Sequence, residues 1–395
     1  MSAHEVVVVG AGPAGSTAAR RLAAAGVRVL VLDTARFPRP KVCGGALSPR
    51  VLGYAPAGIE RQFRTGIRRA VFSYCAAQPF EVVADRPLGY TVRREEFDFW
   101  LLERAAAAGA AIRDGARVQA VERDGERILL RVSGERVRAR LVIGADGANS
   151  IVAEGLCPHD HPPPLLALQA EMASPWPHGE TARVDVGRYP RGYAWAFPVG
   201  DRVNIGVMLG RAHGRRLEEA LARFLAGAAC LPGGHPGGAK AAPVAGFRDG
   251  AGGCAAPGVL LVGDAARLAD PFLGEGIYYA MWSGSLAADA VLAGGDGEAI
   301  AGRYGTAVAG TIWPELRMAG RIAFCFHCMP RWWFRLLSRL PRGILRYAGV
   351  LAGEESYRGL VRRLLVRLEG GTGRWVGERL GIARKEERSD SKRCK

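Results

Sequence analysis

The sequence of 395 residues predicts an α/β protein, α+β overall, from three observations. Four consecutive valines, 6–9, precede closely spaced glycines and a helical pattern, which is typical of a buried parallel strand in a βαβ unit. Between residues 165 and 209 apolar and polar residues alternate, which predicts an antiparallel sheet. Roughly the last hundred residues have helical spacing. We therefore expect a Rossmann-like domain with three-layer ββα character, an antiparallel-sheet domain and a C-terminal helical region.

The first strand, turn and helix predict a dinucleotide site. The glycines fit the pattern G-x-G-x-x-G, in which they allow a tight turn, a close approach of the pyrophosphate and close helix packing. The helix over 16–25 then directs free N–H groups at the phosphates. A second strand, 27–32, ends at Asp33, whose carboxylate suits a ribose hydroxyl. This pattern leaves NAD and FAD open. Its turn residues are Gly10, Gly12, Pro13, Ala14 and Gly15.

The loop after Asp33 should lie over the bound cofactor. It runs from Arg36 to Gly45, and its two prolines exclude regular structure. Cys43 is either a small buried hydrophobe or a functional thiol. The nearby cation of Lys41 favours the second interpretation. The residues predicted to face the cofactor from this loop are Lys41, Cys43, Gly44 and Gly45.

Two later helices begin at candidate ligand-binding positions. Arg94 opens a helix that extends to about Ala108, so it is either a phosphate ligand or a surface arginine. A buried strand near 259–262 leads into the segment 270–277 and a further helix. Glycines at a helix start direct N–H groups at a ligand that becomes negative, which suits a reduced flavin. This segment supplies Pro271, Gly274, Gly276 and Ile277.

An aromatic strand is predicted on the substrate side. Tyr193, Trp195 and Phe197 alternate within 190–198, so their side chains point from one face of the strand. They form either an apolar wall for a substrate or ordinary core packing.

The net charge of +16 favours an anionic partner. Arginines recur at helical spacing beside Trp332 and Trp333, and again from Arg358 to Arg367, which suits an anionic membrane surface or solvated core helices. The early first strand, the absence of a long apolar run and the scattered cysteines predict a cytoplasmic protein. If the arginine-rich helices bind lipid, it would be peripheral on the inner face of the cell membrane. The sequence contains no stacking platform of the kind that binds nucleic acid, so we expect no nucleic-acid partner. We also expect a monomer.

Over about residues 5–290 the chain resembles the geranylgeranyl reductase family, within the flavoprotein class shaped like p-hydroxybenzoate hydroxylase. Pro190, Tyr193, Trp195, Phe197 and Pro198 match its signature P-x-x-Y-x-W-x-F-P. The glycine motif with Asp33 corresponds to its FAD site, although that family more often has glutamate there. The resemblance implies cofactor roles for further residues, namely Asp146 and Gly147 of a "DG" motif, Gly263 and Asp264 beside the ribityl chain, and Arg94.

The resemblance implies that FAD-dependent reduction saturates isolated C=C bonds of a prenyl chain. Cys43, Tyr193 and Trp195 would be catalytic, and Tyr193, Trp195, Phe197 and Pro198 would bind the substrate. The electron donor would be NADPH or a ferredoxin. Ala153 and Glu154 stand where the class often has arginine, which weakens a nicotinamide site. Two alternatives remain, a monooxygenase or halogenase of the same fold, and an electron-transfer flavoprotein acting on quinone.

The expected domains interleave along the chain. Residues 1–60, 92–156 and 250–297 should form the FAD-binding domain, and 61–91 with 157–249 the substrate domain. Residues 298–384 should form the C-terminal helical region, and 385–395 a disordered tail.

Overall fold

The buried valines form the centre of an eight-stranded sheet in the computed structural model, which describes residues 3–158, 165–173, 178–227, 237–247, 253–339 and 349–367. Its core is parallel, in the order β18 (Val259–Leu261), β11 (Glu135–Gly144), β1 (Ala3–Val9), β2 (Val29–Leu32) and β8 (Ala111–Arg113). The predicted Rossmann-like arrangement is therefore confirmed. Antiparallel strands extend it, namely β9 (Val118–Asp124), β10 (Arg127–Val132) and β17 (Ala255–Ala256).

Four helices pack beside this sheet. They are α1 (Pro13–Ala24), α2 (Arg94–Ala107), α3 (Ile151–Leu156) and α5 (Ile277–Leu292). The starts of α1, α2 and α5 are the glycine turn, Arg94 and the segment 270–277 that the sequence analysis identified. Helix α1 packs against both α2 and α5. The apolar residues of α1, α5 and the parallel strands share one core, which fixes the starts of α1 and α5 relative to the strands.

The second large sheet of the fold has seven strands. Its order is β16 (Gly237–Val244), β12 (Leu165–Met172), β15 (Arg202–Gly210), β14 (Tyr193–Val199), β13 (Thr181–Val186), β5 (Arg69–Tyr74) and β6 (Ala77–Val83). All pairs are antiparallel except β13 with β5, where the earlier β5–β6 hairpin joins the sheet. Ala194 and Ala196 face a core shared with α4 (Leu217–Gly227), so the aromatic side chains of β14 face the other way, as predicted.

A small three-stranded sheet and four short 3₁₀ helices connect the larger parts. The strands are β3 (Ala46–Leu47), β4 (Thr65–Ile67) and β7 (Gly89–Thr91), in the order β3-β7-β4. The 3₁₀ helices are η1 (Pro49–Gly53), η2 (Ile59–Gln62), η3 (Arg211–Arg216) and η4 (Gly263–Ala266).

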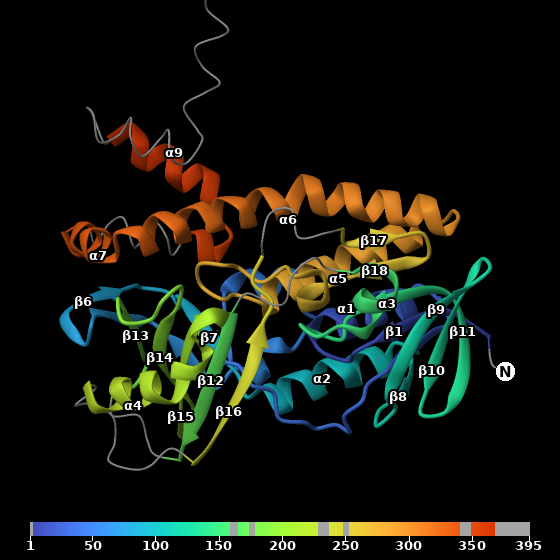
Figure 1. Ribbon diagram of the computed structural model, residues 1–395, viewed down its shortest axis with the longest axis horizontal. Helices are drawn as coiled ribbons and strands as arrows, with labels where there is room; N and C mark the ends of the chain where they lie inside the picture. The colour runs from blue at the N-terminus through green and yellow to red at the C-terminus, as the bar shows by residue number, and fades with distance from the viewer. Residues whose placement is uncertain are drawn as a thin grey trace, which may run out of the picture.

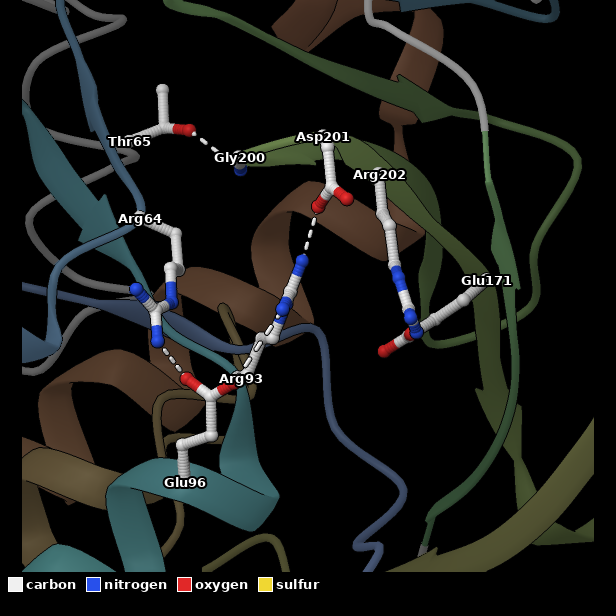
Figure 2. A network of polar contacts seen from close by, with 8 residues as sticks. All are labelled: Arg64, Thr65, Arg93, Glu96, Glu171, Gly200, Asp201 and Arg202. Atoms are coloured by element: carbon white, nitrogen blue, oxygen red, sulfur yellow. Dashed lines mark hydrogen bonds and ion pairs between the residues drawn. The ribbon is translucent and has the colours of Figure 1, made fainter.

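A polar network fixes the turn between β14 and β15 against the start of α2 (Figure 2). Arg93 pairs with Asp201 in that turn and with Glu96 at 3.4 Å. The Gly200 amide donates to Thr65 Oγ1 at 3.1 Å. Exposed ion pairs contribute little stability individually. Their effect is to hold the turn that follows the aromatic strand against the start of α2. The network also includes Arg64, Glu171 and Arg202.

Three helices complete the described chain. Helix α6 (Gly297–Cys328) extends along the molecule above α5, and α7 (Pro330–Arg339) lies at its far end over the seven-stranded sheet (Figure 1). Helix α9 (Tyr357–Arg367) packs on α6. Within the described ranges no helix is both long and apolar enough to cross a bilayer. The predicted tail, 385–395, lies outside the described residues.

Candidate active site

One cavity of about 1480 Å³ lies between the two large sheets and the C-terminal helices. Nearly all residues predicted for the site line it, from the glycine turn and Asp33 through Cys43 and Arg94 to the aromatic strand. Four predicted residues are not part of its wall, namely Gly15, Pro198, Gly263 and Pro271. The structure therefore brings the flavin-side and substrate-side motifs to one continuous space.

The glycine turn leaves room for a phosphate. At Gly10, φ is +101° and a Cβ atom would lie 2.3 Å from the Ala145 carbonyl oxygen, so only glycine fits between β1 and β11. A Cβ atom at Gly12 would meet only Arg39, at 3.8 Å. Gly12 is the N-cap of α1 and no side chain caps this helix. The free N–H groups of α1 therefore border open space, which fits a pyrophosphate.

Two carboxylates border the cavity at strand ends. Asp33 accepts from the amides of Ala11 at 2.8 Å and Ala35 at 2.9 Å, which fixes it beside the glycine turn. Asp264 lines the cavity next to Gly276, and within the described part of the chain no donor contacts its carboxylate. A half-buried carboxylate without a protein donor fits a ribityl hydroxyl.

The Asp146 carboxylate has a structural task. It accepts from Ser150 Oγ at 2.5 Å and from the Ile151 amide at 2.7 Å, so it holds the first turn of α3. Burial, opposed by these hydrogen bonds, raises its pKa. Both carboxylate oxygens of Asp146 are therefore used by the turn that begins α3. The next residue, Gly147, also lines the cavity.

The loop before α5 depends on buried charges that sequence reasoning missed. Asp270 accepts from the amides of Phe272 at 2.7 Å and Leu273 at 3.0 Å, and from the Tyr357 hydroxyl of α9 at 2.6 Å. Glu275 forms a buried ion pair with Arg50 of η1. These contacts hold the loop that presents Gly274 and Gly276 to the cavity.

Cys43 is anchored by its backbone to the seven-stranded sheet. Its amide donates to Gln169 Oε1 at 2.9 Å, and its carbonyl accepts from Asn204 Nδ2 at 3.0 Å. Trp195 Nε1 donates to Asn204 Oδ1 at 2.8 Å. A Cβ atom at Gly44 would lie 3.2 Å from Trp195 Nε1, so the loop lies directly against the aromatic strand. No sequence pattern identified Gln169 or Asn204.

Arg94 lies beside the thiol. Its Nε and Nη2 atoms donate to both oxygens of Asp98, at 2.9 and 2.8 Å, and the Cys43 side chain lies close enough to interact electrostatically with its guanidinium. Two of the three guanidinium nitrogens of Arg94 are thus engaged by Asp98. Its predicted contact with FAD stays a prediction. Asp98, which is fully buried, was not predicted.

Tyr193 connects the aromatic strand to the loop before α5. Its hydroxyl donates to the Leu273 carbonyl. Burial, and after it the nearby Asp270 carboxylate, raises the pKa of Tyr193, so the hydroxyl stays protonated at neutral pH.

The cavity continues to the C-terminal helices, which the sequence had not linked to the site. Trp333 and Phe334 of α7 line it, whereas Trp332 is 40% exposed. The sequence left open whether this helix contacts a membrane surface or belongs to the core. Trp333 lies on the apolar face of α7, which closes the cavity, and the membrane contact stays a prediction. Burial, and after it the charge of Arg191, lowers the pKa of His327 to about 4, so this wall residue is neutral at pH 7.

Comparisons with known proteins agree with this geometry. Residues 3–159 match an FAD binding domain. A digeranylgeranylglycerophospholipid reductase of Methanopyrus kandleri is 35% identical over 315 residues, covering 72% of this chain and 79% of that protein. A menaquinone reductase of Mycolicibacterium smegmatis is 35% identical over 318 residues, covering 74% and 77%.

Solved structures extend the likeness to nearly the whole chain. A geranylgeranyl bacteriochlorophyll reductase-like protein from Thermoplasma acidophilum superposes with a TM-score of 0.74 at 25% identity, covering 92% of this chain and 99% of that one. A flavin-dependent brominase superposes with a TM-score of 0.69 at 20% identity, which shows a shared fold alone.

The fold and the matched domain define an FAD-dependent oxidoreductase. Within that class, the chain belongs to the geranylgeranyl reductase family.

Proposed function

We propose that this protein saturates isolated C=C bonds of a prenyl chain carried by a lipid or a quinone. The observation that carries the proposal is one continuous cavity, which begins at the residues fitted to FAD and continues as an apolar space to α7. A prenyl chain needs such a space because it is long and apolar. Relatives named for a lipid substrate and for menaquinone support both carriers.

The cofactor end of the cavity suits FAD. The start of α1 and Gly12 would receive the pyrophosphate, Asp33 a ribose hydroxyl and Asp264 the ribityl chain. Residues at the start of α5 would offer N–H groups to the anionic end of the ring. Bound FAD, once reduced by NADPH or a ferredoxin, would supply the hydride.

The protein's own residues address the remaining difficulty, which is that an isolated alkene has no electron-withdrawing group. Hydride transfer then requires simultaneous protonation and passes through cationic character at a tertiary carbon. Cys43 is the proposed proton donor, and Arg94 beside it would stabilise the resulting thiolate. Trp195 and Phe197, whose rings lie 6.3 Å apart, would face the developing positive charge with their π systems.

The function is tested by product mass. We expect the anaerobically reduced enzyme to convert geranylgeranyl diphosphate or a geranylgeranylated lipid into products heavier by two hydrogens per bond. Mass spectrometry of the extracted substrate checks this. A product heavier by oxygen, formed only in air, would instead support the monooxygenase alternative.

We further propose an anionic membrane surface as a partner. Arg331 and Arg335 are exposed on α7, four residues apart and hence on one face, beside the partly exposed Trp332. Two other exposed apolar residues, Phe324 and Met329, lie at the neighbouring end of α6. Exposed cations beside exposed apolar side chains fit the interface of an anionic bilayer.

Flotation with phosphatidylglycerol vesicles tests this partner. We expect the protein to float at low salt and to be released at high salt, because salt screens the attraction of arginine for anionic lipid. Arg331→Glu with Arg335→Glu should abolish flotation. Arg127→Glu with Arg136→Glu, the same charge change at exposed positions of β10 and β11, should not. Equal flotation with neutral vesicles would contradict the proposal.

A further inference from the structure

A straight row of side chains crosses the seven-stranded sheet from the reaction centre to its edge. Trp195 pairs with Val184, Val184 with Phe72, and Phe72 with Phe80 on the edge strand β6. Directly paired residues share a face, and all four line the cavity. With strands about 4.8 Å apart, the row spans about 14 Å, so it forms a floor for an extended apolar chain.

At the edge of the sheet this floor meets α7 in an aromatic cluster. The ring centroid of Phe334 lies 5.1 Å from that of Phe80 and 5.7 Å from that of Tyr74. Figure 1 shows the corresponding arrangement, with α7 above β6 at one end of the molecule. Phe334 is only 3% exposed, so it fills the space between the helix and the β5–β6 hairpin.

The cavity reaches the surface on α7, the helix that carries Phe334. Arg339, the last residue of α7, is exposed and also belongs to the cavity wall. Arg331 lies close enough to Tyr74 to act on it electrostatically. The aromatic cluster therefore separates an apolar interior from the cationic, apolar surface proposed above to contact lipid.

We propose that the prenyl chain enters and leaves through a gate formed by Phe334 against Tyr74 and Phe80, which opens directly onto an anionic lipid surface. This inference rests on the proposed function, since it assigns the access route of that substrate. Two ring contacts of Phe334 join the helix to the hairpin, each worth on the order of 1 kcal/mol. A rigid-body shift of α7 or a rotation of the Phe334 side chain would open it. The row from Phe80 to Trp195 then guides the chain to Cys43.

The test separates access from chemistry with two single-turnover measurements. In the first, reduced enzyme is mixed anaerobically with geranylgeranyl diphosphate in phosphatidylglycerol vesicles at low substrate concentration, and flavin reoxidation is followed. In the second, oxidised enzyme is loaded with the same substrate and then reduced with one equivalent of dithionite. Phe334→Trp should slow the first by roughly tenfold, equivalent to about 1.4 kcal/mol of barrier, and leave the second unchanged. Tyr74→Ala, at the gate residue that is not part of the cavity wall, should accelerate the first and leave the second unchanged.

The outcomes distinguish the gate from the function. Leu292→Trp, at an exposed position at the end of α5, is the control for adding an indole, and should match the wild type in both measurements. If Phe334→Trp does not retain FAD, Tyr74→Ala decides, because Tyr74 lies at the end of β5 and outside the cavity wall. Unchanged mixing rates, or equal slowing in both measurements, would overturn the gate. Absence of reoxidation by substrate in the wild type in both measurements would overturn the proposed function itself.

Discussion

Replacing Cys43 by alanine should leave FAD bound and reducible by dithionite, but slow flavin reoxidation by a prenyl substrate by roughly 100-fold, the range for loss of a general acid. The structure gives a reason to expect a clean effect. The two backbone anchors of Cys43, to Gln169 and Asn204, are independent of the thiol, which itself accepts only a long hydrogen bond from the Gly45 amide at 3.4 Å among the bonds of the described residues. The loop should therefore keep its position when the side chain is shortened. Stopped-flow absorbance under nitrogen measures the reoxidation rate.

Two further variants interpret that result. Cys43→Ser keeps a hydrogen-bonding group next to Arg94 but offers a much weaker acid, so it should be nearly as slow as alanine. Cys157→Ala removes a thiol that donates to the Gly253 carbonyl outside the cavity, and should behave like the wild type. Wild-type rates in both Cys43 variants would make this cysteine a packing residue. Loss of FAD from both would instead make the loop a cofactor clamp.

The sequence predicted those parts of the site that depend on local pattern. Gly10 and Gly12 were identified because their spacing between a strand and a helix is nearly sufficient to define the turn. Tyr193, Trp195 and Phe197 were assigned to one face because strand periodicity dictates it. Each of these predictions needs only residues close together in the sequence.

The parts that escaped prediction are contacts between distant segments. Arg50 and Glu275 are separated by 225 positions, and Asp270 and Tyr357 by 87. Neither pair has a characteristic spacing, because only the packing of η1 and α9 against the loop before α5 brings them together. The closure of the cavity by α7 was hidden for the same reason. Its amphipathic pattern shows an apolar face but not what that face covers.

Replacing Arg50 by methionine should have the largest effect on stability, because it leaves Glu275 buried without its partner. The Arg50 and Glu275 side chains are 7% and 9% exposed, and the guanidinium lies 4.0 Å from the centre of the Tyr278 ring. Breaking a buried ion pair from one side costs about 3–5 kcal/mol. We expect a large fall in the thermal unfolding midpoint of the FAD-bound protein, and weaker FAD retention because Gly274 and Gly276 flank Glu275.

The pH dependence of this loss identifies its cause. Burial raises the pKa of Glu275 and Arg50 opposes the rise, so removing Arg50 should raise it further. A carboxyl group with a raised pKa in the folded state binds protons more tightly there than in the unfolded chain, so folding stability increases as the pH falls through that raised value. The deficit of Arg50→Met relative to the wild type should therefore be largest at neutral pH and shrink on acidification towards the pKa of an ordinary glutamate.

A double substitution completes the argument. Arg50→Met combined with Glu275→Gln removes both charges, so it should recover most of the lost stability and abolish the difference in pH dependence. Arg138→Met, which breaks an exposed pair with Asp124 at 2.7 Å, should change the midpoint little. Glu275→Gln alone is the fourth variant. Differential scanning fluorimetry of the four variants and the wild type across a pH series measures the unfolding midpoint of each. A deficit in Arg50→Met that is independent of pH, and that Glu275→Gln does not relieve, would assign the effect to lost packing on Tyr278 instead.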